Sequence, residues 1–280
     1  MIKRKTIMRS VQYSGIGIHK GETIDLKLLP AEVNTGITFK RVDVKENNIV
    51  ELKAENVFSP TRGTNIKNDF DVRIHTVEHF LSALYVYGIT DLLVEVSGNE
   101  MPIGDGSAFH FLELVDIAGV KEFDESVDVI EIKEPIFVAE EDRYVIGLPH
   151  NAYKVTYAIK FDHTFLKSQL AEFEITQKIF KYDISNARTF GFDYEEKYLK
   201  ENNLALGASL QNAIVITDNG VKNEDGLRFE DEFVRHKILD LVGDMKVLNR
   251  PIKGHIIAIK AGHSLHSKFA KKLLKTIGGE

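Results

Sequence analysis

Residues 234–244 of this chain read Val234-Arg235-His236-Lys237-Ile238-Leu239-Asp240-Leu241-Val242-Gly243-Asp244. The segment predicts a largely apolar helix that is buried over most of its surface. His236, Asp240 and Asp244 follow one another at intervals of four residues, so they form a polar stripe along one face. A charge buried without a partner costs several kcal/mol. A metal ion would offset that cost, and His-x-x-x-Asp is a ligand spacing that one helical turn can supply.

The alternative interpretation is an ordinary amphipathic helix with Lys237 and Asp240 in solvent. A single short motif match is more often of this kind. We favour the metal site because a second segment also places ionisable side chains on a helix that is expected to be buried.

The second segment reads Asp71-Val72-Arg73-Ile74-His75-Thr76-Val77-Glu78-His79-Phe80-Leu81-Ser82-Ala83-Leu84-Tyr85-Val86-Tyr87-Gly88. Its apolar residues recur at helical spacing and predict a helix over 73–87, with Asp71 as N-cap and Gly88 as its end. Glu78 and His79 point about 100° apart on such a helix. One side chain is then suited to bind a metal and the other to act as a general base. A surface glutamate beside a histidine at the core edge is the plainer alternative.

His75 and His79 also fit the H-x-x-E-H pattern of a zinc peptidase. That interpretation makes these two histidines the metal ligands and leaves the stripe at 236–244 unexplained. A site built from His79, His236 and Asp240 explains both helices with one ion. We therefore favour the two-helix site, which predicts that His75 is dispensable.

The amino-acid composition excludes several classes of function for this chain. The chain has 280 residues, of which 43% are hydrophobic and 28% charged, and a net charge of -6. These values are ordinary for a globular protein and disfavour a general nucleic-acid or anionic-membrane surface. There is no cysteine, so metal ligands must come from histidine, carboxylates or water. We expect a cytoplasmic protein without a signal peptide, a membrane span or stable membrane insertion.

The order of the predicted elements repeats. Each half has strands, a helix, a strand and a final helix, which indicates an α+β fold with two similar domains. The expected domains are 1–122 and 128–280, and the charged stretch 121–128 is the expected linker. Because each half carries one site helix, we expect the site at the domain interface. The expected elements are strands before residue 60, a helix at 73–87, a strand at 90–97, a helix near 107–119, strands at 129–132, 136–138, 144–148 and 154–159, a helix at 231–248, a strand at 254–260 and a helix near 265–276.

Other residues are candidates for catalysis or binding. His263 stands at a strand-to-helix junction, where it is suited to acid–base work with Asp244 as an orienting partner, although a surface histidine is an equal alternative. Thr189 is a candidate for stabilising an oxyanion. Lys237 and Lys260 are candidates for binding phosphate oxygens. The apolar stretch 199–210 is either core or one wall of an apolar channel.

Several motifs recur in one order and together resemble the family of UDP-3-O-acyl-N-acetylglucosamine deacetylases, the zinc amidases of lipid A synthesis. The resemblance covers nearly the whole chain. Its motifs are Thr76-Val77-Glu78-His79, Pro102-Ile103-Gly104-Asp105-Gly106-Ser107, Ala187-Arg188-Thr189-Phe190, Asn223-Glu224-Asp225-Gly226-Leu227-Arg228, His236-Lys237-Ile238-Leu239-Asp240 and Gly262-His263-Ser264-Leu265.

The resemblance implies two α+β domains, each with a helix pair packed on a sheet, and an active site between them. It implies a zinc ion, although the same ligand set also suits Fe²⁺. It further implies an insert near 190–210 that forms a passage for the acyl chain. The roles that it implies are zinc ligation by His79, His236 and Asp240, general base for Glu78, general acid for His263, orientation of that acid by Asp244, oxyanion stabilisation by Thr189, and substrate binding by Lys237, Phe192 and Lys260.

This chain departs from the family pattern at Gly207-Ala208, at Glu196 and at His75. The first two positions bear on the shape of the acyl passage and leave the chemistry unaffected. The third supports treating the H-x-x-E-H match as coincidence.

The predicted reaction is zinc-dependent hydrolysis of the N-acetyl group of UDP-3-O-(3-hydroxyacyl)-N-acetylglucosamine, which yields the free amine and acetate. We expect a monomer that binds this nucleotide sugar and no nucleic acid. Two alternatives remain at this point. One is the zinc peptidase that uses His75 and His79, and the other is a nucleotide-sugar-binding protein without catalysis, whose metal is structural.

Overall fold

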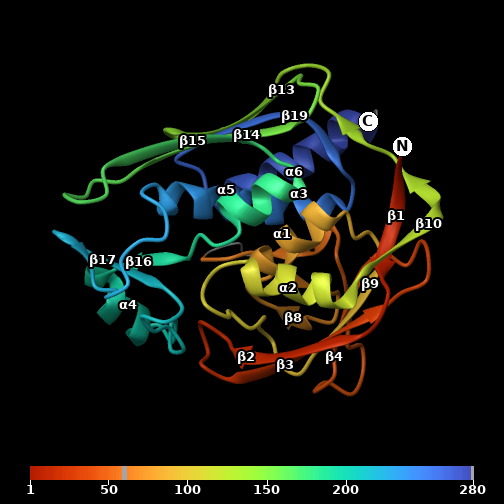
Figure 1. Cartoon of the computed structure of the whole chain (residues 1–280), viewed down its shortest axis with the longest axis horizontal. Coiled ribbons are helices and arrows are strands. Elements are labelled where there is room, and N and C mark those ends of the chain that lie inside the picture. Colours follow the sequence, from red (N-terminus) through yellow and green to blue (C-terminus); the bar gives the residue numbers. More distant parts are fainter. Residues whose placement is uncertain (59–61, 279–280) are drawn as a thin grey trace.

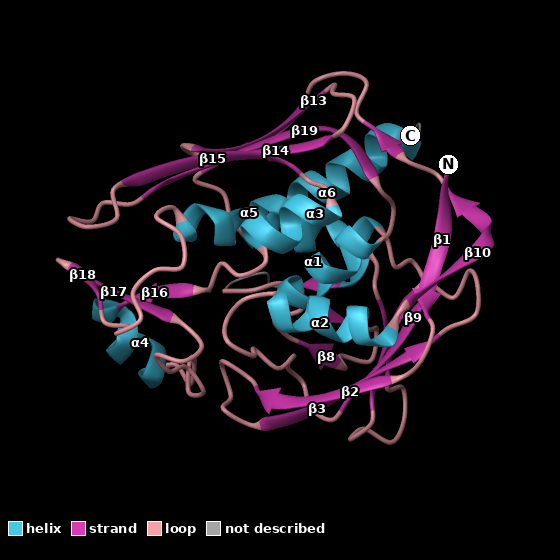
Figure 2. Cartoon of the chain, in the orientation of Figure 1, coloured by secondary structure: helices cyan, strands magenta, loops and turns pink. Residues whose placement is uncertain are grey.

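A computed structural model describes residues 1–58 and 62–278 of the chain. Most of its helices lie between two sheets, one built from each half of the sequence (Figure 1). Figure 2 shows the same layers, with strands outside and helices inside. This mixture of helices and separate sheets confirms the α+β class.

The sheet of the first half has the strand order β2-β3-β9-β4-β5. Alternate residues of β3, Ile24, Leu26 and Leu28, are buried, as expected for a strand that has one face on the core. Helices α1 and α2 cover that face (Figure 1). The bounds are β2 Val11–Ile16, β3 Thr23–Pro30, β4 Ile37–Arg41, β5 Ile49–Glu51, β9 Leu92–Val96, α1 Glu78–Tyr87 and α2 Phe109–Ala118, with a smaller sheet of β6 Val57–Phe58, β7 Asn65–Lys67 and β8 Arg73–Ile74.

The sheet of the second half has the order β12-β13-β19-β14-β15, and β11 pairs with the start of β19. Helices α5 and α6 lie on its inner face (Figure 1). The expected helix at 231–248 is confirmed as α5 followed by a short 3₁₀ turn. The bounds are β11 Ile130–Glu131, β12 Ile136–Glu140, β13 Arg143–Leu148, β14 Tyr153–Lys160, β15 Ser168–Glu174, β19 Ile252–Ile259, α5 Glu232–Met245 and α6 His263–Gly278.

Helices α1 and α5 pack directly against each other and bring the two halves together. Gly243 makes this approach possible, because a Cβ atom at this position would collide with the backbone carbonyl of Glu78. The residue that begins α1 therefore lies against the C-terminal half of α5.

The helix predicted over 73–87 begins later than the apolar pattern indicated. Arg73 and Ile74 form strand β8, and α1 starts at Glu78. Thr76 has a φ of 58°, a left-handed conformation that interrupts any helix and is rare for a β-branched residue. The expectation of Asp71 as N-cap is wrong, because its carboxylate pairs with Lys67 and Arg73. The C-terminal expectation is confirmed, since Gly88 adopts a φ of 69° and ends the helix.

The charged stretch expected as a linker is instead strand β10, Val120–Val127, which pairs with β1, Ile2–Ile7. The two strands form an exposed ribbon in which Lys3 faces Asp124 and Lys5 faces Glu122. The charge pattern therefore reflects a solvent-exposed ribbon with pairing across its strands.

A third small unit follows β15 and contains the segment 190–210 that the resemblance implied as an insert, although its strands and helix were not among the expected elements. It contains the sheet β16-β17-β18 with α4 beside it, on the left of Figure 1. None of the described helices is both long enough and apolar enough to cross a membrane. The bounds are α3 Gln177–Ile179, the π-helical turn Phe180–Ile184, β16 Phe190–Phe192, α4 Glu196–Glu201, β17 Ile214–Thr217 and β18 Gly220–Val221.

Candidate active site

His79 from α1 and His236 and Asp240 from α5 converge on one point between the two helices. Each offers a ligand atom within 4.8 Å of the other two, and all three are almost fully buried. Asp240 Oδ1 lies 3.4 Å from His236 Nε2 and 3.7 Å from His79 Nε2. The structure thus brings together the three residues predicted as metal ligands.

The hydrogen bonds around this group fit a bound cation. Asp240 Oδ2 accepts from Lys237 Nζ at 2.7 Å, but the buried Oδ1 has no hydrogen-bond partner among the described residues. His236 donates its Nδ1 proton to the Ala187 carbonyl at 3.0 Å, which leaves Nε2 unprotonated on the side of Asp240. Two imidazoles and one carboxylate are a donor set that suits Zn²⁺, whose ligands lie at about 2.0–2.2 Å.

The protonation states of the three residues agree with this role. Burial lowers the pKa of His79 to about 3, and burial also lowers the pKa of His236. Burial opposes ionisation of Asp240, but the nearby Lys237 and His236 hold its pKa far below the usual range. Neutral imidazoles beside an ionised carboxylate are the forms that bind a divalent metal.

Glu78, the first residue of α1, lies beside the donor group. Its carboxylate accepts the backbone N–H of Thr64 at 2.9 Å, and its Oε1 lies 3.9 Å from His263 Nε2. Burial, opposed by the nearby His263 and assisted by Asp240, raises the pKa of Glu78 to about 7. The carboxyl group is therefore poised to exchange a proton near neutral pH.

His263, the first residue of α6, also lies beside the donor group, close to both Glu78 and Asp240. Its Nδ1 contacts Asp244 Oδ2 at 2.8 Å, and its Nε2 lies 3.8 Å from Asp240 Oδ2. Burial disfavours its charged form, but Asp244, Glu78 and Asp240 outweigh that effect and raise the pKa of His263 to about 9. The imidazole is therefore protonated at neutral pH.

Asp244 has partners that the sequence analysis missed. Besides His263, it accepts hydrogen bonds from the Thr64 hydroxyl and, at 2.7 Å, from His266 Nδ1. Thr64 lies in a loop before α1, so its approach to Asp244 depends on the packing of the two halves. His266 stands three residues after His263 on α6, a helical spacing that does point to a shared partner.

These residues open into a cavity of about 760 Å³. Thr189, Phe192 and Lys237 line it, as expected, and so does part of the stretch 199–210. Lys260 is not among the described residues that line it, and its ammonium group pairs with Asp142. The basic residues of the cavity that the sequence analysis did not select are His19, Arg62, Arg143, Lys200 and Lys222.

These missed residues carried no sequence motif, because isolated basic residues at strand ends and loops look like surface positions. Arg143 begins β13, and Lys222 follows β18. Lys200 and Lys222 belong to the small unit after β15, whereas His19 and Arg62 reach the cavity from the first half and Arg143 from the sheet of the second half.

His75 lies apart from the donor group. Its Nδ1 contacts Asn65 Oδ1 at 3.0 Å, and its backbone forms a bridge with Glu100. Since α1 begins at Glu78, His75 and His79 do not share a helical face. The H-x-x-E-H interpretation therefore has no structural support.

Comparison with known proteins identifies the family of the chain. A sequence profile described as UDP-3-O-acyl N-acetylglycosamine deacetylase matches residues 4–275. A UDP-3-O-acyl-N-acetylglucosamine deacetylase of Leptospira biflexa is 42% identical over 279 residues, which cover 100% of this chain and 92% of the relative. Proteins of the same name from Citrifermentans bemidjiense and Pseudomonas entomophila are 43% and 42% identical, over 98% of this chain and 90% and 91% of their own lengths. With its two buried site helices and this likeness over nearly its full length, the chain belongs to the UDP-3-O-acyl N-acetylglycosamine deacetylase family.

Proposed function

We propose that this protein hydrolyses the N-acetyl group of UDP-3-O-(3-hydroxyacyl)-N-acetylglucosamine in lipid A biosynthesis. The products are acetate and the free 2-amino sugar. The observation that carries the proposal is one constellation: Glu78 and His263 face each other at 3.9 Å beside the donor group of His79, His236 and Asp240. Family membership supplies the substrate class.

We propose that His79, His236 and Asp240 hold Zn²⁺, although Fe²⁺ also suits their donor atoms. When bound, such an ion polarises a carbonyl oxygen and lowers the pKa of water to about 7. The three ligands come from the protein, which matches a catalytic site that keeps one position open.

Glu78 acts as the general base. Its carboxylate takes a proton from water as the water oxygen attacks the acetamide carbon. The Thr64 N–H bond at 2.9 Å orients the carboxylate while the proton moves. Thr189, on the cavity wall, donates a hydrogen bond to the developing oxyanion.

His263 acts as the general acid. As the C–N bond breaks, its Nε2 donates a proton to the departing amine, and the imidazolium becomes neutral. Asp244 holds Nδ1 at 2.8 Å and so keeps Nε2 directed at the site. One water is consumed: Glu78 takes its first proton, and the second leaves as the new carboxyl group ionises to acetate. The new proton of the amine comes from His263, and transfer of the Glu78 proton to His263 through solvent restores both groups.

The cavity walls fit the two ends of the proposed substrate. Lys237, Arg143 and Lys222 offer cationic groups for a diphosphate. Phe192 and the apolar residues between 199 and 210 offer a wall for the acyl chain. We expect the enzyme to work in the cytoplasm as a monomer, without nucleic acid and without stable membrane insertion.

A nucleotide-sugar-binding protein with a structural metal is the remaining alternative. Structural zinc sites are closed by four protein ligands, whereas the donor group has three among the described residues. A binding protein would also have no need of two facing groups, Glu78 and His263, whose pKa values of about 7 and about 9 suit a base and an acid.

The test is acetate release from the proposed substrate by metal-replete protein, by chelated protein and by chelated protein after zinc is restored. We expect release that stops on chelation and returns with zinc. Absence of release by folded, zinc-loaded protein would overturn the deacetylase assignment. Full release by the chelated protein would overturn the role of the metal.

A further inference from the structure

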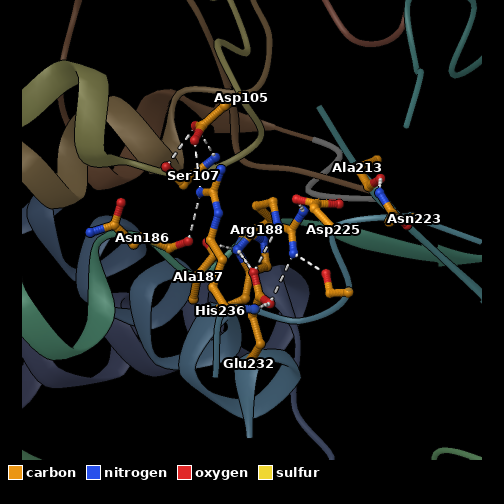
Figure 3. Close-up of polar contacts among 12 residues, drawn as sticks. Asp105, Ser107, Asn186, Ala187, Arg188, Ala213, Asn223, Asp225, Glu232 and His236 are labelled. Carbon is orange, nitrogen blue, oxygen red and sulfur yellow. Dashed lines mark hydrogen bonds and ion pairs between the residues drawn. The ribbon is translucent and has the colours of Figure 1, made fainter. Parts of the chain in front are cut away.

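Residues 186–189 run past the N-terminal half of α5, and Figure 3 shows the contacts of Asn186, Ala187 and Arg188. The contacts, in chain order, are Arg228 Nη1 to the Asn186 carbonyl at 3.0 Å, His236 Nδ1 to the Ala187 carbonyl at 3.0 Å, the Arg188 N–H to Glu232 Oε1 at 3.0 Å, and the Thr189 N–H to the Gly106 carbonyl at 2.8 Å. We call these residues the 186–189 segment. It meets the proposed site at two of its residues: Ala187, which contacts the ring of His236, and Thr189, which lines the cavity.

A buried ion pair anchors the middle of the segment. Arg188 is 2% exposed and Glu232 is fully buried. Arg188 Nε lies 2.9 Å from Glu232 Oε1, and Nη2 lies 3.2 Å from Oε2. The remaining guanidinium protons reach Asp225 Oδ2 at 2.9 Å and the Gly226 carbonyl at 2.7 Å. This planar, two-pronged geometry is specific to arginine and fixes the segment in one register.

Spacing on α5 connects this pair to the metal ligand. Glu232 and His236 stand four residues apart on the helix, so they lie one above the other on one face. Ala187 and Arg188 are neighbours in the segment and meet these two side chains in turn. A shift of the segment along the helix would break both contacts together.

The contact to Ala187 matters because it determines the tautomer and the ring orientation of His236. A ligating histidine depends on its second ring nitrogen, which must donate to a fixed acceptor. Thr189 follows two residues later and is one of the residues that line the cavity. Both features depend on where the segment lies.

We propose that Arg188 and Glu232 are positioning residues for the metal ligand His236 and for Thr189. They hold the 186–189 segment in register with α5, and the segment in turn directs His236 Nε2 at the donor group. This inference rests on the proposed metal-dependent function.

The experiment compares Arg188→Met, Arg188→Lys and Glu232→Gln with wild type. The measurements are zinc dissociation constants by chelator competition, the visible absorption spectrum of the Co²⁺-substituted protein, and kcat and KM. We expect a 10–100-fold weaker zinc affinity for Arg188→Met, the range seen when outer partners of metal ligands are removed. We also expect an altered Co²⁺ spectrum and a lower kcat with little change in KM. Arg188→Lys keeps the charge and should recover part of the loss.

Arg4→Met is the matched control, because Arg4 makes a similar paired contact to the buried Asp91, at 2.9 and 2.5 Å, away from the site. It should lose thermal stability but keep the wild-type zinc affinity and Co²⁺ spectrum.

Wild-type zinc affinity and spectrum in the Arg188 and Glu232 variants would overturn the inference. So would an equal loss in Arg4→Met, which would show a general effect of breaking a buried pair. If Arg188→Met does not fold, Arg188→Lys and Glu232→Gln decide the question by the same readouts. Failure of the proposed function is distinguishable, because it would show in the wild type, as absent zinc binding or absent acetate release.

Discussion

At the scale of single residues, the proposed site assigns proton transfer and metal binding to different side chains. Glu78 and His79 are adjacent in sequence, yet one faces His263 and the other faces Asp240. Neighbours on a helix point in different directions, so one turn can place a base and a ligand side by side. Changing one of them therefore tests its role while the other stays in place.

Replacing Glu78 with glutamine removes the base and preserves the shape of the side chain. We expect kcat to fall about 10²–10⁴-fold, the usual contribution of a positioned base. Zinc content should remain at the wild-type level, because the glutamate is not one of the three donors. Steady-state kinetics with metal analysis checks both statements, and near-normal turnover would remove Glu78 from the role of base.

Lys246 is a buried cation outside the site, and it makes stability depend on pH. Its Nζ donates to the Ile89 carbonyl at 2.5 Å, and the side chain is almost fully buried near the Arg4–Asp91 pair. Burial lowers the pKa of Lys246 from 10.5 to about 7; Asp91 opposes the shift and Arg4 adds to it. Between these two values the unfolded chain binds more protons than the folded one. The free energy of unfolding therefore rises with pH from about 7 to 10.5.

Lys246→Met should remove this slope. We expect the variant to be more stable than wild type by about 1–3 kcal/mol at pH 6, where the full penalty for the buried ammonium is present. The difference should shrink as pH rises toward 10. Urea unfolding of the metal-free proteins across this pH range measures the difference, and a gap that is constant with pH would contradict the expectation.

At the scale of elements, the contact between α1 and α5 positions the site. Gly243 lies where α5 touches the backbone of Glu78. Glycine inside an exposed helix normally costs about 1 kcal/mol relative to alanine. Here the close approach of the two helices reverses that preference.

Gly243→Ala should therefore destabilise the protein, by about 1–3 kcal/mol, because the added methyl forces α1 and α5 apart. The same displacement should weaken zinc binding, since His79 lies on one helix and its partner ligands on the other. Thermal unfolding and chelator competition test both effects. A gain in stability, the ordinary result for glycine to alanine in a helix, would show that the helices are not in close contact here.

Helix α5 could be predicted from sequence because its length and apolar period left little choice. The start of α1 could not. Ile74 and Val77 fit a helical period, but the left-handed Thr76 separates them, and its surroundings come from distant residues: Glu100 contacts its hydroxyl at 3.3 Å, and Asn65 contacts its N–H at 3.3 Å. Local periodicity carries no information about such contacts. The same holds for β10, whose partner strand lies at the other end of its half.

At the scale of the whole molecule, the site joins the two halves of the chain. Sequence motifs could predict the three proposed metal ligands, and they could predict Glu78 and His263. They could not predict that Thr64, Arg143 and Lys222 lie at the site. Each of these three reaches the site through the packing of separate units, and sequence spacing does not encode that packing.

Because the three proposed ligands come from both halves of the chain, we expect zinc to stabilise the folded chain as a whole. We expect a rise in Tm on zinc addition that corresponds to about 4 kcal/mol at a zinc concentration 1,000 times the dissociation constant. His79→Ala and His236→Ala should each lose most of this rise. His75→Ala is the control and should keep it. The opposite pattern, with His75 required and His236 dispensable, would favour the H-x-x-E-H ligand set.

The division of the proposed ligands between α1 and α5 also sets an order of events during synthesis on the ribosome. About 160 residues separate His79 from Asp240. Translation adds about 5–20 residues per second, so the first proposed ligand emerges roughly 8–30 s before the last. Strand β19, which pairs with both β13 and β14, emerges later still. The nascent first half thus leaves the ribosome with one histidine of the proposed centre, and metal capture awaits the end of translation.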